Sequence, residues 1–151
     1  MSQPIFVFGF GSLMNEASLQ QTLPGKKITS WAVLKGHRRA FNKAGRRGHG
    51  YLNLRPDPAY NVKGVLICVT EHELEELKRR EEGYSLVDVT GQIERKPSPD
   101  AVIYAFIASP FDALKVSRRY LNTVLATIPQ EKQEQWIKET DFGNAEIDEE
   151  N

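Results

Sequence analysis

The 151-residue chain has little of several features that would assign a function directly. Its single cysteine, Cys68, excludes an intrachain disulfide, and without a second cysteine or a local histidine pair it is a poor metal ligand. Because Cys68 lies in the apolar run from Val65 to Val69, we expect a buried structural thiol. We expect neither a metal nor a cofactor.

Net charge and long apolar runs are also missing. Lysine plus arginine equal aspartate plus glutamate at 20 each, so the whole molecule has no net charge to attract nucleic acid or a membrane surface. No apolar run approaches the roughly 18 residues that a membrane span requires. No basic segment precedes the first apolar run, so we expect a cytoplasmic protein without a signal peptide.

The N-terminal stretch IFVFGFGSLMN, residues 5–15, begins as an apolar, β-favouring run that two glycines break before Ser12. Glycine lets the main chain turn sharply or lets a ligand approach its amides. Two nucleotide motifs are excluded: Met14 stands where G-x-G-x-x-G requires a third glycine, and no Gly-Lys-Ser/Thr follows. Two interpretations stay open, a strand that ends in a tight turn and a binding loop.

The remaining pattern predicts a single domain over residues 1–138 and an acidic, disordered tail over residues 139–151. About six strands of mixed order favour an α+β fold, with a small closed or strongly curved β-barrel and flanking helices. The further strands are expected at residues 31–41 with a bulge at Gly36, 51–54, 62–69, 84–89 and 101–109; the helices are expected at 71–82, at 113–127 with Leu114 on the buried stripe, and at 129–138.

A basic segment stands out in this neutral chain. Six lysine or arginine residues and no acid lie between Lys35 and Arg47. Such a cluster is typical of a solvated loop, but it also suits contacts to phosphates or to the carboxylates of a small ligand. RNA binding is less favoured, because only Phe41 is interleaved as a stacking platform.

Glu81 is the most informative side chain of the expected helix at 71–82. At about 100° per residue it falls between Leu74 and Leu77 on the buried stripe, whereas Glu82 points about 80° away. Burial and the negative end of the helix dipole both raise the pKa of a carboxyl there, as a general acid/base near neutrality requires. A frayed helix end or a structural ion pair with an arginine is the alternative.

Five short motifs together resemble the gamma-glutamylcyclotransferase superfamily, and its ChaC-type branch in particular. Two positions depart from the motifs: Phe10 replaces the usual tyrosine and Lys78 the usual aspartate. The motifs cover about residues 5–125 in the correct order and are F-G-F-G-S-L at 8–13, G-H-R-R-A-F at 36–41, R-G at 47–48, L-K-R-R-E followed by G-Y at 77–84, and S-R-R-Y-L at 117–121.

This resemblance implies a small mixed β-barrel whose substrate carries a γ-glutamyl group, as in glutathione or a γ-glutamyl amino acid. The substrate's own α-amino group attacks its γ-amide carbonyl, closes 5-oxoproline and expels the amine, so that neither an enzyme nucleophile nor a cofactor takes part. The resemblance assigns the proton transfers to Glu81, and we do not expect Ser12 to be a nucleophile. It assigns substrate contacts to Phe10, Gly11, Ser12, Leu13, Tyr84 and Tyr120.

Three alternatives stay open beside this hypothesis. One is a sister activity on γ-glutamyl side-chain amides, such as lysine isopeptides or an acylated biosynthetic intermediate. The second is a non-catalytic small-molecule binding module, and the third is RNA binding by residues 35–49. Oligomeric state is not predicted.

Overall fold

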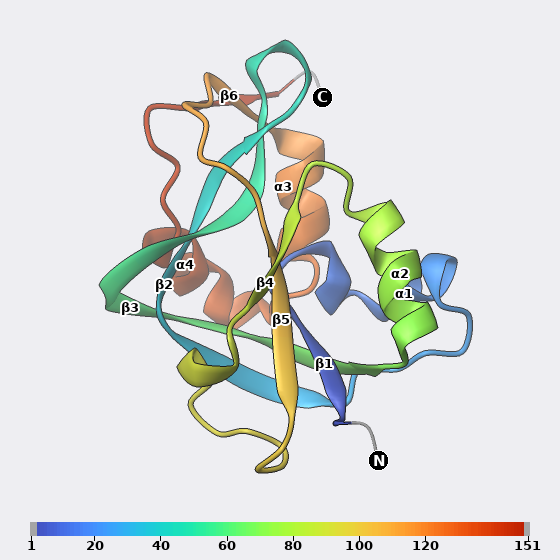
Figure 1. Ribbon diagram of the computed structural model, residues 1–151. Coiled ribbons are helices and arrows are strands. Elements are labelled where there is room, and N and C mark those ends of the chain that lie inside the picture. Colours follow the sequence, from blue (N-terminus) through green and yellow to red (C-terminus); the bar gives the residue numbers. More distant parts are fainter. Residues whose placement is uncertain (1–2, 150–151) are drawn as a thin grey trace.

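A five-stranded, strongly curled sheet organises the computed structural model, which describes residues 3–149 (Figure 1). Neighbouring strands are antiparallel except β1 and β5, which pair in parallel. The predicted α+β class with a mixed, strongly curved sheet is therefore confirmed. The order in the sheet is β2 (Ser30–Ala44), β3 (Gly50–Val69), β1 (Ile5–Gly9), β5 (Val102–Ile107) and β4 (Ser85–Asp88).

Two pairs of helices cover different sides of this sheet (Figure 1). One pair is α1 (Glu16–Thr22) with α2 (Glu71–Arg80), and the other is α3 (Arg118–Leu125) with α4 (Gln130–Glu139). Three short 3-10 turns lie at Ser12–Met14, Arg46–Gly48 and Thr90–Gln92. In residues 3–149 no helix is long and apolar enough to cross a membrane.

Strand β1 is apolar on both faces because each face covers a different core. Phe6 and Phe8 point into the cluster inside the curl of the sheet, whereas Val7 belongs to the cluster beneath α1 and α2. Leu77 of α2 is fully buried in that second cluster. The curl brings the edge strand β2 close to the segment after β4, where the N–H of Glu94 donates to the carbonyl of Val33 at 2.9 Å.

Strand β3 differs from the sequence prediction, which placed separate strands at 51–54 and 62–69. It runs unbroken through the proline-containing segment 55–61, beside β2. The pairing register shifts between Lys35 and His37, and Gly36 adopts φ +72° there, so the predicted bulge is confirmed. Pro56 lies at this bulge, opposite His37, where the ladder is already irregular and tolerates a residue without an N–H.

The segment before α3 was predicted to be helical from residue 113, which is wrong. Residues Lys115–Ser117 form strand β6, and Leu114, expected on the buried stripe, is 68% exposed. Ser117 accepts the N–H of Tyr120 and caps the helix, so α3 begins only at Arg118.

Residues 140–149, for which the sequence predicts disorder, pack against the domain. Thr140 is buried, and Glu146–Asp148 form strand β7, parallel to β6. Acidic side chains of this segment contact basic residues of the domain: Asp141 lies 3.0 Å from Arg55 of β3, and Asp148 lies 2.8 Å from His49, just before β3. The last two residues of the predicted tail, 150–151, lie outside the described residues.

Cys68 is exposed, so the prediction of a buried thiol is wrong. Along β3, Ile67 and Val69 face the core under α2, and Cys68 alternates to the other face. Leu66 on that other face is still buried, so the inner core ends before Cys68.

Candidate active site

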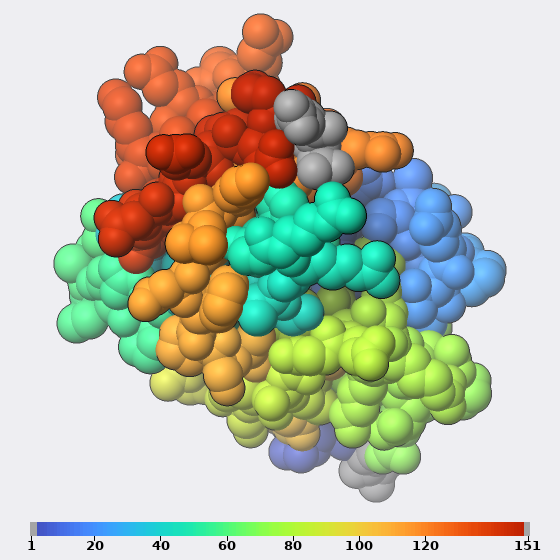
Figure 2. Space-filling view, turned by 90° about the horizontal axis from the view of Figure 1, so that it is seen from above, coloured from blue at the N-terminus to red at the C-terminus, as the bar shows by residue number. Residues whose placement is uncertain are grey.

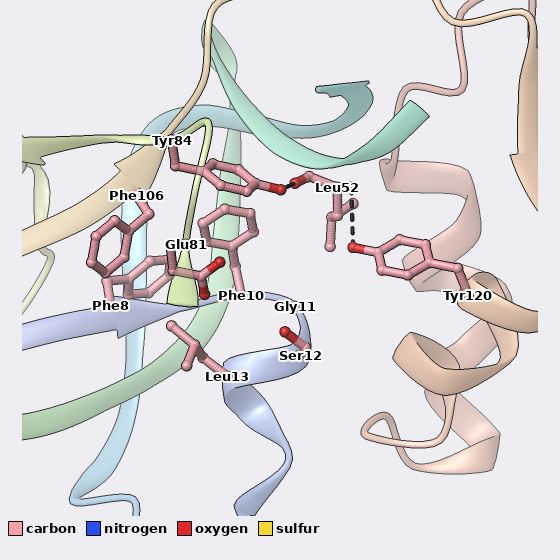
Figure 3. A pocket seen from close by; sticks show the side chains of 10 residues that line it. All are labelled: Phe8, Phe10, Gly11, Ser12, Leu13, Leu52, Glu81, Tyr84, Phe106 and Tyr120. Atoms are coloured by element: carbon pink, nitrogen blue, oxygen red, sulfur yellow. Dashed lines mark hydrogen bonds between the residues drawn. The ribbon is translucent and has the colours of Figure 1, made fainter. Parts of the chain in front are cut away.

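One pocket contains all seven residues that the sequence analysis assigned to the site (Figure 3). They come from three segments far apart in the chain: the turn after β1, the segment between α2 and β4, and the first turn of α3. The pocket is lined by Phe8, Phe10, Gly11, Ser12, Leu13, Leu52, Glu81, Tyr84, Phe106 and Tyr120.

Glu81 is the C-cap residue of α2, and its N–H still donates to the carbonyl of Leu77 at 2.9 Å. Its side chain is 16% exposed and points into the pocket between the aromatic rings (Figure 3). Glu82, the next residue, is exposed and does not line the pocket. The helical spacing therefore predicted correctly which of the two glutamates is inside.

The surroundings of Glu81 act on its pKa in opposite directions. Burial disfavours the carboxylate and raises the pKa, whereas the positive charges of Arg80 and Lys43 lower it. The effect of burial is the larger, so the pKa lies above that of an ordinary glutamate. Such a carboxyl gains and loses a proton nearer to neutral pH, which is what proton transfer in both directions requires.

Arg80 connects the two halves of the pocket, a role that the sequence analysis did not predict. One terminal nitrogen donates to the hydroxyl groups of Ser12, at 3.2 Å, and Ser18, at 2.7 Å. The other donates to the carbonyl of Ser18 at 2.8 Å and to the hydroxyl of Thr22 at 3.3 Å. Because its Nε lies 3.8 Å from Glu81, this one side chain fixes the turn after β1 relative to the carboxyl.

The turn at residues 11–13 offers main-chain donors to the pocket wall. The N–H of Met14 donates to the carbonyl of Gly11 at 2.9 Å and closes the 3-10 turn. Within residues 3–149 the N–H groups of Ser12 and Leu13 have no hydrogen-bond acceptor. A Cβ atom on Gly11 would lie 3.3 Å from the side chain of Leu52, so glycine lets the turn pack closely against β3.

The main chain of Leu52 orients two tyrosine hydroxyls, and Figure 3 shows both beside it. The hydroxyl of Tyr84 donates to the carbonyl of Leu52 at 2.7 Å, so its lone pairs remain free to accept. The hydroxyl of Tyr120 accepts the N–H of Leu52 at 3.2 Å, so its own proton remains free to donate. Burial raises the pKa of both tyrosines, which keeps both hydroxyls protonated at neutral pH.

Phenylalanines form the apolar wall of the pocket. Phe8 and Phe10 stack with ring centroids 6.4 Å apart, and Phe106 lines the same wall. Phe10 is one of the two positions that depart from the family motifs, and it brings no polar group to this wall. The other, Lys78, is exposed and pairs with Glu75 at 3.1 Å, away from the pocket lining.

Metal ligands are not gathered at this site: among residues 3–149, no group of three histidine, cysteine, aspartate or glutamate side chains is placed to hold an ion. The polar groups of the pocket are instead a carboxyl, hydroxyls and main-chain amides. Such groups bind organic ligands and move protons.

Comparisons with known proteins agree with the fold and the motifs. A family model described as gamma-glutamyl cyclotransferase, AIG2-like, matches residues 7–126. A solved structure named gamma-glutamyl cyclotransferase has a TM-score of 0.73 at 16% identity, over 98% of this chain and 95% of that one. An uncharacterized Homo sapiens protein has a TM-score of 0.73 at 17% identity, over 99% and 96%. An Arabidopsis thaliana protein has a TM-score of 0.55 at 27% identity, over 71% and 70%. No match is found among curated proteins.

Proposed function

The chain belongs to the gamma-glutamyl cyclotransferase, AIG2-like family, and from this membership we propose that it releases 5-oxoproline from γ-glutamyl amides. The observation that carries the proposal is the placement of the buried Glu81 carboxyl in one small pocket with the turn at residues 11–13. The substrate supplies both reacting groups, so the protein has to fold the substrate and move protons.

The proposed reaction needs no water and no other reactant. Glu81, ionised, takes a proton from the substrate's α-ammonium group, and the free amine attacks the γ-carbonyl carbon. Glu81 gives this proton to the leaving nitrogen as the bond from the carbonyl carbon to that nitrogen breaks. The attacking nitrogen still carries one proton too many, and Glu81 takes this second proton and passes it to the departing amine. The products are 5-oxoproline and the protonated amine, and Glu81 is again ionised.

The other polar groups of the pocket match the charges of such a substrate. The N–H groups of Ser12 and Leu13, without acceptors within residues 3–149, are suited to the oxygen that becomes negative during attack or to the α-carboxylate. The hydroxyl of Tyr120 donates in the same way, whereas that of Tyr84 is free to accept from the α-ammonium. The phenylalanine wall excludes water, which strengthens these interactions.

Mass-spectrometric detection of 5-oxoproline tests the proposal with glutathione, γ-glutamyl-alanine and γ-glutamyl-ε-lysine as parallel substrates. Release from glutathione or γ-glutamyl-alanine supports the proposed activity, and release from the lysine isopeptide alone assigns the sister activity. Tight binding without 5-oxoproline from any of the three would contradict an enzyme and favour a binding module.

A further inference from the structure

A second, basic cleft adjoins the candidate active site and shares Tyr120 with it. Three arginines line this cleft: Arg46 and Arg47 from the 3-10 turn between β2 and β3, and Arg119 from the first turn of α3. Figure 2 shows this turn (teal) at the surface, between the segment before α3 (orange) and the end of α2 (yellow-green). Part of the basic segment noted in the sequence therefore lies beside the pocket.

All three arginines are exposed, and within residues 3–149 none of them has a carboxylate within 4.0 Å. By contrast, Arg118, the neighbour of Arg119, lies 3.0 Å from Glu149. The cleft's histidine, His49, is hydrogen-bonded to Asp148 at 2.8 Å, so the nearby carboxylate of Asp148 already has a partner.

The first turn of α3 carries charges of the sign that a helix N-terminus disfavours. A first helical turn favours acidic residues, yet that of α3 contains Arg118 and Arg119 and no acid. Lys43 continues the charge toward the pocket: its Nζ lies 5.8 Å from the ring centroid of Tyr51, in the cleft, and 5.2 Å from that of Tyr84, in the pocket. A cluster of cations that includes this unfavourable helix position suits the binding of an anionic ligand.

We propose that this cleft binds an anionic group, a carboxylate or a phosphate, carried by the amine that leaves the γ-glutamyl substrate. The inference rests on the proposed function, which places the γ-glutamyl group in the adjoining pocket. Beyond the amide nitrogen, the leaving group passes Tyr120, which lines both the pocket and the cleft, and reaches the arginines. Charge-assisted hydrogen bonds from guanidinium groups then hold the anion.

The proposal ranks the candidate substrates. A γ-glutamyl amino acid carries its carboxylate on the carbon next to the leaving nitrogen. A lysine isopeptide carries its carboxylate several methylene groups farther away, beside an ammonium that the arginines repel. γ-Glutamyl-ethylamine has no anion at all, so we expect the order γ-glutamyl-glutamate, γ-glutamyl-alanine, then the isopeptide and the ethylamide.

The test compares kcat/KM for γ-glutamyl-glutamate and γ-glutamyl-ethylamine, with 5-oxoproline as the readout. Arg119→Gln is expected to lower kcat/KM for the anionic substrate by about tenfold, mainly through KM, and to leave the ethylamide unchanged. Arg46→Gln acts in the same direction, and higher salt weakens the preference. Arg118→Gln is the matched control: it removes an equal charge one residue away, outside the cleft, and leaves both substrates unchanged.

Equal kcat/KM for the two substrates in the unmodified protein would overturn the inference and leave the proposed function intact. An equal loss on both substrates in Arg119→Gln would do the same. If neither of these substrates nor glutathione, γ-glutamyl-alanine or γ-glutamyl-ε-lysine yields 5-oxoproline, the proposed function fails, and titration calorimetry of γ-glutamyl-glutamate and γ-glutamyl-ethylamine then tests the cleft alone. Tighter binding of the anionic compound, lost in Arg119→Gln, supports the cleft, and equal affinities refute it.

Discussion

Glu81→Gln is expected to lower kcat for 5-oxoproline release by about a hundredfold or more, the usual contribution of a positioned acid/base group. Glutamine keeps the size of the side chain and its place between the aromatic rings, but it accepts no proton at neutral pH. The substrate contacts made by the turn at residues 11–13 and by the tyrosines remain, so KM is expected to change much less than kcat.

The same variant is expected to be as stable as the unmodified protein, or more stable, at neutral pH. Because the pKa of Glu81 is raised in the folded state, the folded protein binds this proton more tightly than the unfolded chain. Ionised Glu81 therefore lowers stability at neutral pH, and this cost disappears as the pH falls through its folded pKa. Glutamine removes the cost without protonation, so the Tm difference between the two proteins should shrink as the pH falls.

Glu82→Gln is the matched control, because the same change is made one residue later on an exposed side chain. Its kcat is expected to stay within about twofold of the unmodified value, as for an ordinary surface substitution. For each variant, 5-oxoproline release and a thermal melt are measured on the same preparation. Retained turnover in Glu81→Gln, or equal losses in the two variants, would refute the assignment of the proton transfers to Glu81.

Three further variants test other parts of the site and the fold. Lys43→Met removes a charge that lowers the pKa of Glu81, so the acidic limb of the kcat/KM profile should move to higher pH; a limb that stays in place would contradict this. Tyr120→Phe should lower kcat and cost about 1–3 kcal/mol in the free energy of unfolding, measured in urea, because a buried N–H loses its acceptor. Gly36→Ala should cost about 1 kcal/mol because of its φ of +72°, whereas Gly91→Ala, in open space without a positive φ, should be nearly neutral by the same measurement.

The helical periodicity of the sequence was sufficient to predict that Glu81 lies on the buried face of α2. The spacing of Leu74 and Leu77 defines which face of α2 is buried, and both leucines are buried in the structure. The same reasoning failed before α3, because Leu114 fits a helical stripe although residues 115–117 pair with β7. A parallel partner about thirty residues away leaves no periodic trace in the sequence.

Groups that act through the main chain or across elements were not predictable from local pattern. Leu52 reads as an ordinary core residue of β3, yet its peptide groups fix the orientation of two tyrosine hydroxyls. Arg80 reads as one of several basic residues that end α2, but it alone among them bonds to α1 and to Ser12. Only the tertiary fold distinguishes such residues from solvated ones.

In the proposed mechanism, the positive charges around Glu81, including those of Arg80 and Lys43, set the order in which it accepts and returns a proton. Burial favours the neutral form of Glu81, which accepts no proton, and the positive charges of Arg80 and Lys43 oppose this effect. Binding of a substrate ammonium adds a third positive charge, which lowers the pKa of Glu81 further and favours the carboxylate when a proton has to be accepted. Once the ammonium has lost its proton, that added charge is gone and the pKa rises again. Glu81 then holds the proton until the leaving nitrogen, more basic after attack at the carbonyl, takes it.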